Sequence, residues 1–177
     1  DMPEDRGQVL APVHRDHPHP RALGPPRRMR WHADPKWLRH HDHTSSLSAL
    51  VSAGGRLFYI MDAGSRSAIV LPPRWRLVAR DAFNGKHLWR RDIPEWHPHL
   101  WRLKIGPAQL PRRLASDGPM VYATLGINAA VSQLEASSGR TAQTYAGTEG
   151  TEELLIDRDV LFAQINREPR KTYTAYR

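Results

Sequence analysis

The most informative segment of this sequence runs from residue 74 to residue 93 and reads Arg-Trp-Arg-Leu-Val-Ala-Arg-Asp-Ala-Phe-Asn-Gly-Lys-His-Leu-Trp-Arg-Arg-Asp-Ile. Two β-prone runs flank Asn84-Gly85, and Asn-Gly is the strongest short-range signal of a β-hairpin. We expect a loop longer than two residues, in which the Asp81 carboxylate caps the turn and Gly85 takes the left-handed conformation. Trp89 then closes over one face of the hairpin. Because a single hairpin is marginal in water, the chain must supply further strands.

A second segment repeats this arrangement. Residues 131–145 carry Glu135 and Gly139 with the same four-residue separation as Asp81 and Gly85. The segments that approach the hairpins also recur, and three of them align: 49–60, 112–123 and, more weakly, 152–163. A repeat of about 40 to 60 residues with four short strands in each unit is typical of a β-propeller.

The first copy resembles a known family of repeats. Its pattern Leu-x-Ala-x-Asp-Ala-x-x-Gly-x-x-Leu-Trp is similar to the PQQ-like repeat, the pyrroloquinoline-quinone-type or tryptophan-docking propeller repeat, and Asp81, Gly85 and Trp89 match its signature positions. In the second copy Glu135 stands for the aspartate and Gln143 for the tryptophan. The alternative is that Asp, Gly and Trp at this spacing make one ordinary hairpin.

The resemblance covers about residues 46–165 and implies an all-β fold. The expected architecture is a partial β-propeller of four-stranded antiparallel blades, with about two blades and the start of a third. Because propellers close with typically four to eight blades, we expect the rest of the propeller to lie outside this chain. Two observations agree with that expectation. The first residue is Asp1 rather than Met, and residues 171–177 look like an unfinished strand.

The chain divides into two parts by composition. Residues 1–30 are rich in proline, histidine and arginine, and their low hydrophobicity predicts a loop or linker. Residues 31–177 are expected to form the partial propeller. Three apolar side chains near its start could dock against a sheet, namely Trp31, Trp37 and Leu38. The first strands are expected at 45–52 and 56–61, joined by a glycine turn at 53–55.

A loop insertion is expected at residues 94–111, because its four prolines exclude a long helix or a central strand. Loops on a rigid scaffold are where binding residues concentrate. The candidate binding residues of this loop are Trp96, His97, His99 and Trp101. The alternative is that its aromatic residues form a small local core that packs the loop down.

The net charge of +8 is uneven along the chain. Residues 74–113 hold ten Lys or Arg against three acids. A protein partner or an anionic ligand fits this charge, whereas nucleic acid is not expected because such charges more often form a solvated face. His40-His41-Asp42-His43 suits a metal by composition, but neighbouring side chains rarely converge on one ion, so no metal site is assigned. No apolar run is long enough to span a membrane.

The resemblance also raises an enzyme hypothesis. Quinoprotein dehydrogenases of this fold hold pyrroloquinoline quinone and calcium, with an aspartate base and a vicinal cysteine pair. This sequence contains no cysteine and offers no aligned calcium ligands, so no cofactor and no catalytic residue is assigned. Proteins with this repeat but no cofactor, which resemble the outer-membrane assembly lipoprotein, use the propeller as a docking surface.

The sequence therefore predicts a non-catalytic propeller scaffold or binding module. The resemblance places it outside the cytoplasm, either periplasmic or secreted. The alternative is a fragment of a quinoprotein oxidoreductase, which would need pyrroloquinoline quinone and calcium.

Overall fold

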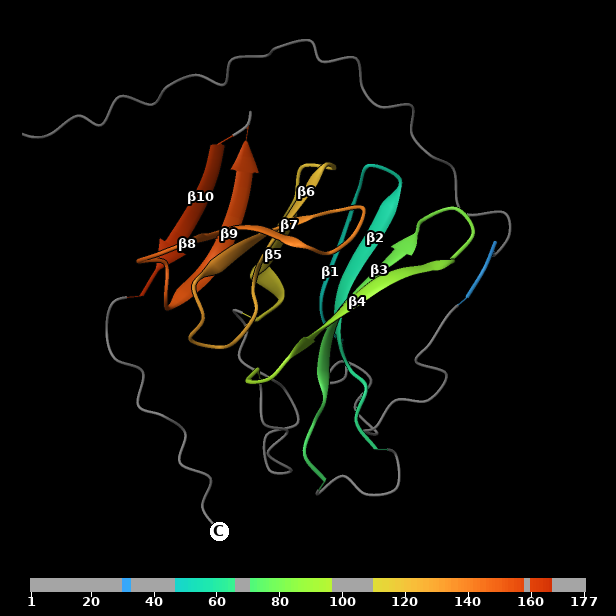
Figure 1. Cartoon of the computed structure of the whole chain (residues 1–177), viewed down its shortest axis with the longest axis horizontal. Coiled ribbons are helices and arrows are strands. Elements are labelled where there is room, and N and C mark those ends of the chain that lie inside the picture. The colour runs from blue at the N-terminus through green and yellow to red at the C-terminus, as the bar shows by residue number, and fades with distance from the viewer. Residues whose placement is uncertain (1–29, 33–46, 66–70, 97–109, 158–159, 167–177) are drawn as a thin grey trace, which may run out of the picture.

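A computed structural model describes residues 30–32, 47–65, 71–96, 110–157 and 160–166. The described chain is all-β, as the sequence predicts, apart from one short 3-10 turn, η1 (Leu110–Arg112). It contains two four-stranded antiparallel sheets and one two-stranded hairpin (Figure 1). Neither four-stranded sheet closes on itself, because the first and fourth strands of each sheet do not pair with each other.

Both four-stranded sheets are simple meanders in which consecutive strands pair. Sheet 1 consists of β1 (Leu47–Ala53), β2 (Arg56–Asp62), β3 (Trp75–Asp81) and β4 (His87–Ile93). Sheet 2 consists of β5 (Leu114–Ser116), β6 (Met120–Thr124), β7 (Val131–Glu135) and β8 (Thr141–Tyr145). The hairpin consists of β9 (Thr151–Asp157) and β10 (Val160–Ile165).

The hairpin predicted around Asn84-Gly85 is confirmed as β3 and β4. The Asp81 carboxylate accepts hydrogen bonds from the backbone N–H groups of Phe83 and Asn84, at 2.8 and 2.9 Å. Gly85 has a φ of 74° and donates its N–H to the Asp81 carbonyl at 2.9 Å. The strands predicted at 45–52 and 56–61 correspond to β1 and β2 to within two residues.

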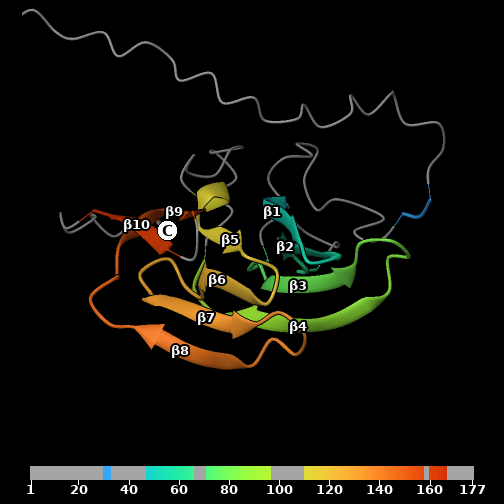
Figure 2. The ribbon, with the colours of Figure 1, turned by 90° about the horizontal axis from the view of Figure 1, so that it is seen from above.

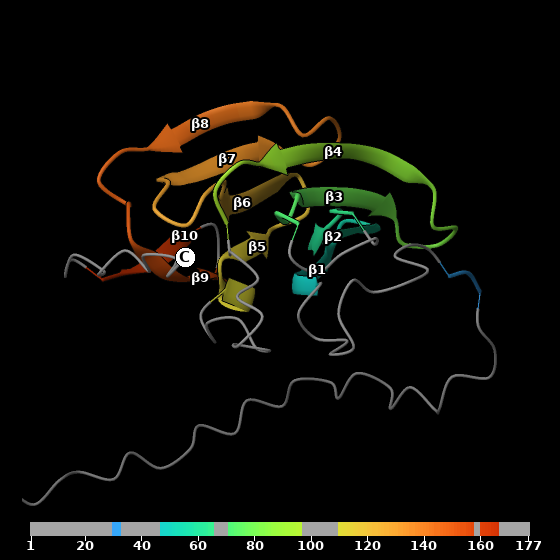
Figure 3. The same cartoon turned by 90° about the horizontal axis from the view of Figure 1, so that it is seen from below.

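The sheets are stacked in chain order, with sheet 2 between sheet 1 and the β9–β10 hairpin (Figures 2 and 3). The first strands β1, β5 and β9 lie along one edge of the stack, whereas β4 and β8 lie at the opposite edge. Successive side chains of a strand point to opposite faces, so each sheet can contribute to the cores on both sides.

Two apolar layers hold the stack together. Between sheets 1 and 2 the buried residues include Phe58, Ile60, Leu77 and Ala79 from sheet 1 and Val121, Ala123 and Leu134 from sheet 2. Between sheet 2 and the hairpin the cluster is smaller, with Tyr122, Val131 and Leu154 at its centre. Burial of apolar area at about 25 cal/mol per Å² makes these layers the main source of cohesion between the sheets.

The strand pairing corrects the sequence alignment of the approach segments by one residue. Arg56 pairs with Asp81, and Met120 pairs with Glu135, so Met120 occupies in sheet 2 the position of Arg56 in sheet 1. The sequence alignment of 49–60 with 112–123 instead puts Pro119 at that position. A shift of one residue moves every side chain to the other face, so the corrected register decides which side chains are equivalent.

The predicted division of the chain is only partly described. Residues 1–29, which make up nearly all of the expected linker, lie outside the described residues, as do Trp37 and Leu38. So does most of the expected insertion at 94–111 and the segment 171–177. These boundaries stay predictions.

Candidate functional site

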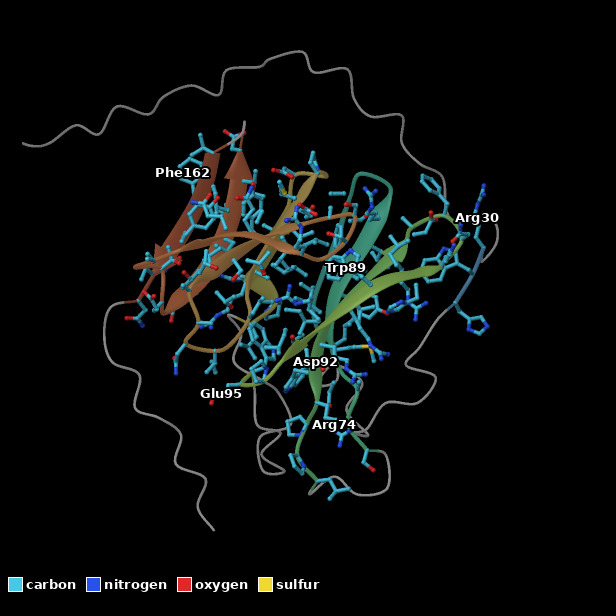
Figure 4. All side chains as sticks on the ribbon, in the orientation of Figure 1. Arg30, Arg74, Trp89, Asp92, Glu95 and Phe162 are labelled. Carbon is cyan, nitrogen blue, oxygen red and sulfur yellow. The ribbon has the colours of Figure 1, made fainter. Side chains whose placement is uncertain are left out.

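Trp89 on β4 joins sheet 1 to sheet 2. Its side chain is buried, and the indole Nε1 donates a hydrogen bond to the carbonyl oxygen of Ala136, at 2.9 Å, in the β7–β8 turn (Figure 4). The ring also lies flat against Gly139, since a Cβ added to that glycine would fall 2.6 Å from the nearest ring carbon. Phe58 supports the indole from within sheet 1, with ring centroids 6.0 Å apart. One side chain thus combines a buried hydrogen bond with close packing across two sheets.

Trp31 makes the same contact on sheet 1. Its Nε1 donates to the carbonyl oxygen of Ala82 at 3.0 Å, and a Cβ added to Gly85 would fall 2.6 Å from its ring. The β3–β4 turn of sheet 1 therefore receives Trp31 as the β7–β8 turn of sheet 2 receives Trp89. The sequence predicts only that Trp31 docks against a sheet. Its equivalence to Trp89 was missed, because no signature strand surrounds it in the sequence.

The two receiving turns share one backbone design. In each turn the glycine N–H donates to the carbonyl of the acidic residue four positions earlier, Asp81 at 2.9 Å and Glu135 at 2.8 Å. The carboxylates differ in their partners: Asp81 accepts from backbone N–H groups, whereas Glu135 accepts from Ser138 Oγ at 2.8 Å and from the Arg140 guanidinium. Hydrogen bonds from Ser138 and then Arg140 lower the pKa of Glu135.

An arginine also reaches the glycine carbonyl in both turns. Arg80 donates to the Gly85 carbonyl at 2.8 Å from within sheet 1. Arg91 donates to the Gly139 carbonyl at 2.7 Å from β4, two residues after Trp89, so this bond crosses from sheet 1 to sheet 2. Arg91 is therefore a second polar link between the sheets that the sequence did not single out.

Gln143 takes the position of Trp89 in sheet 2. Trp89 pairs with Ala79 beside a β-bulge, and Gln143 pairs with Gln133 beside a bulge at the same place. Unlike Trp89, Gln143 is exposed. Sheet 2 thus does not present an indole from its last strand.

Only one of the four candidate binding-loop residues lies in the described part of the chain. Trp96 is buried in the core between the sheets, and its Nε1 donates to Ser48 Oγ at 3.0 Å. His97, His99 and Trp101 lie outside the described residues. The structure therefore places Trp96 in the packing of β1 rather than at a surface.

Several basic side chains of the 74–113 region are engaged within the fold. Arg76 forms an ion pair with Asp92 at 2.6 Å, and the fully buried Arg113 donates to the Ile127 carbonyl at 2.7 Å. The exposed cations of the described part of this region are Arg74, Lys86, Arg90 and the ion-paired Arg112. Among the described residues of this region, the exposed cations are thus fewer than the sequence count indicates.

The imidazole of His87 lies at this cationic surface. Desolvation lowers its pKa below 6.5, and the positive charges of Arg80 and Arg90 lower it further. His87 is exposed on β4 at the end nearest the β3–β4 turn. The neutral imidazole is therefore the favoured form close to neutral pH.

An exposed apolar face lies at the other end of the stack. Leu155 on β9 pairs with Phe162 on β10, and both side chains, with Val160, point away from sheet 2. The exposed fractions of Leu155, Phe162 and Val160 are 59%, 54% and 51%. Phe162 is labelled in Figure 4. Single exposed apolar residues are common, but three adjacent ones on one sheet face form a patch.

Among the described residues, no three side chains of His, Cys, Asp or Glu gather in a way that could hold a metal ion. That part of the chain also contains no helix long and apolar enough to cross a membrane. His40 to His43, the histidine-rich segment considered in the sequence, lies outside the described ranges.

Comparison with known proteins adds no family assignment. The chain matches no protein-family model, and no curated protein sequence matches it significantly.

Proposed function

We propose that this chain is a non-catalytic binding module whose stacked sheets are repeats of the PQQ-like propeller type. The observation that carries the proposal is the repeated tryptophan contact. Trp31 and Trp89 each donate an indole hydrogen bond to an alanine carbonyl and cover a left-handed glycine four residues after an acid. Two turns built alike and covered alike support a repeat in which each sheet docks on the next.

The contact suits a scaffold because it fixes the angle between neighbouring sheets. A buried indole removes about 150 to 250 Å² from water, and its N–H adds a directional bond. A stack fixed in this way holds surface residues in constant relative positions, which a binding surface requires. In the resemblance on which the proposal rests, such proteins lie outside the cytoplasm, and we propose the same compartment here.

The partner class we propose is a protein or an anionic ligand. Lys86 in the β3–β4 turn and Arg90 on β4 are exposed and favour an anion there. The apolar patch on β9 and β10 favours a protein. No quinone or calcium is part of the proposal, and Asp81 and Glu135 are assigned to their turns rather than to catalysis.

The test compares binding with quinone chemistry in the intact chain. The chain is mixed with pyrroloquinoline quinone and calcium, and absorbance and dye reduction are followed with alcohols and sugars as substrates. In parallel, it is titrated with an anionic polysaccharide and screened against an array of extended peptides. We expect saturable binding of a polysaccharide or peptide and no quinone turnover. A stoichiometric quinone spectrum with turnover would replace the proposal by a quinoprotein oxidoreductase fragment.

A further inference from the structure

The β3–β4 turn contains the only Asn-Gly pair in the sequence, Asn84-Gly85. Asn84 is exposed, and its carboxamide oxygen accepts a hydrogen bond from the Lys86 backbone N–H at 2.8 Å. This bond holds the carboxamide against the backbone that follows it, on the side of the Gly85 peptide. Because glycine has no Cβ, no side chain obstructs the approach of its nitrogen to the carboxamide carbon. The turn therefore brings together the two groups that react in asparagine deamidation.

Deamidation is an intramolecular substitution that consumes only water. The Gly85 nitrogen loses its proton and bonds to the side-chain carbon of Asn84, and the carboxamide nitrogen leaves as ammonia with that proton. Water then opens the resulting cyclic imide. Opening at the side-chain carbonyl leaves an ordinary aspartate. Opening at the backbone carbonyl leaves isoaspartate, in which the main chain runs through the side chain and is longer by a methylene.

The folded turn restrains this reaction. The Gly85 N–H donates to the Asp81 carbonyl at 2.9 Å, so the attacking nitrogen is engaged. The Trp31 ring lies on Gly85, and its Nε1 donates to the Ala82 carbonyl at 3.0 Å, so the indole holds the turn at two places. The reaction therefore requires the turn to open, and its rate follows the population of the open turn.

The β7–β8 turn has the same design without the reactive group. Ser138 takes the place of Asn84, because its Oγ accepts from the backbone N–H two residues later, that of Arg140, at 3.2 Å. Serine carries a hydroxyl and no carboxamide, so the turn that receives Trp89 cannot deamidate. Of the two tryptophan contacts on the described turns, only that of Trp31 is open to this chemistry.

We propose that Asn84 is a site of spontaneous deamidation, and that isoaspartate at this position releases Trp31 from sheet 1. The indole contacts the Ala82 carbonyl and Gly85, which lie on either side of Asn84 in the chain. The added methylene lies between these two contacts, so the ring cannot keep both. Ordinary aspartate leaves the main chain unchanged and keeps an oxygen for the Lys86 N–H, so that product retains the Trp31 contact.

The reaction is followed in the intact chain during incubation in mildly alkaline buffer. Peptide mapping by mass spectrometry locates each site, because conversion of a carboxamide to a carboxylate changes the mass, and chromatography separates the two products. Asn128 and Asn166 are internal references, since residues with side chains follow them. We expect Asn84 to convert about tenfold faster than either reference, with isoaspartate among its products. Asn84→Ser, which copies the second turn, is the matched control and should show no conversion at this position.

Two measurements connect the reaction to Trp31. Trp31→Ala removes the ring from Gly85 and should speed the conversion of Asn84 by about fivefold or more, because the turn opens more often. In the chain without substitutions, the isoaspartate fraction is isolated, and solvent exchange of the Trp31 Nε1–H is measured by NMR. This exchange should become faster in that fraction, whereas exchange of the Trp89 Nε1–H should not change. Asn84→Asp, which copies the other product, should keep the slow exchange of Trp31.

Three results would overturn the inference. Conversion at Asn84 no faster than at Asn128 would show that the turn is not a reactive site. An unchanged rate in Trp31→Ala would show that the indole does not restrain the reaction. Slow exchange of the Trp31 Nε1–H in the isoaspartate fraction would show that the modified turn still receives the ring. The last measurement uses no substitution, so it decides the release even if Trp31→Ala unfolds.

Discussion

The indole of Trp89 lies directly on Gly139, and its N–H reaches the Ala136 carbonyl three residues before that glycine. The glycine leaves the space that the ring fills, and the turn supplies an acceptor at the edge of the ring. The indole and the turn that receives it therefore match in size and in polarity.

Trp89→Ala should destabilise the chain by about 3 to 5 kcal/mol, as for other large-to-small changes in a core. Trp89→Phe keeps most of the packing but leaves the buried Ala136 carbonyl without its donor, and should cost about 1 to 3 kcal/mol. Urea titration measures both. Leu88→Ala is the control, because the adjacent Leu88 is exposed and its loss should change stability by about 0.5 kcal/mol or less. A loss below about 1 kcal/mol for Trp89→Ala would show that the contact does not hold the sheets together.

Gly139→Ala should be more costly than Gly147→Ala. Both glycines have positive φ, 72° and 81°, so both substitutions carry a backbone cost of about 1 to 2 kcal/mol. Only at Gly139 would the new methyl group collide with an indole, since nothing lies within 4 Å of a Cβ at Gly147. The difference between the two variants in urea titration isolates the collision. Equal losses would mean that Trp89 moves aside without cost.

The Trp31 contact should couple energetically to Gly85. In the chain with Trp31 intact, Gly85→Ala brings a Cβ to 2.6 Å from the ring, whereas in Trp31→Ala the space is vacant. We expect Gly85→Ala to cost less in the Trp31→Ala background, with a coupling of about 0.5 to 3 kcal/mol in a double-mutant cycle. Additive effects of the two substitutions would show that Trp31 does not rest on this turn in solution.

Glu135 should make the second sheet acid-sensitive. Its folded pKa lies below the usual 4.5 because Ser138 and Arg140 stabilise the carboxylate. The ionised Glu135 therefore makes its full contribution to stability above about pH 4.5. This contribution is lost as the pH falls through the lowered folded pKa of Glu135. The stability difference between the parent chain and Glu135→Gln, followed by thermal unfolding from pH 7 to pH 3, should shrink toward acid. Arg140→Gln should raise the Glu135 pKa in a carbon-detected NMR titration, and an unchanged value would remove the ion pair from the explanation.

His87 should titrate below 6.5 in an NMR pH titration, because desolvation and two nearby arginines disfavour its charged form. Since the pKa of His87 is lower in the folded than in the unfolded chain, protonation of His87 opposes folding. The stability that depends on neutral His87 is present at a pH above its unfolded pKa and is lost as the pH falls through its folded pKa. Arg90→Gln removes one of the repelling charges and should raise the His87 pKa. If the His87 pKa is unchanged or lower in Arg90→Gln, the charge of Arg90 does not contribute to the lowered pKa.

The sequence alone was sufficient to predict the features that depend on residues close together in the chain. The β3–β4 turn follows from Asp81, whose carboxylate reaches N–H groups two and three residues on, and from Gly85, which tolerates positive φ. The all-β class and the repetition of the turn at Glu135 and Gly139 follow in the same way. Each of these features is local, so residue type and spacing determine it.

The tertiary structure decided everything that joins distant segments. Trp96 was assigned to a binding loop because of its neighbours in sequence, but composition does not set the direction of a side chain, and it points into the core. Trp31 and Trp89 are equivalent because each indole lies on the glycine of a turn in the tertiary structure. Phe162 corresponds to Phe58 through the pairing of their strands. A slip of one residue reverses the faces of a strand while leaving its sequence pattern nearly unchanged, so register and docking are fixed by packing between sheets.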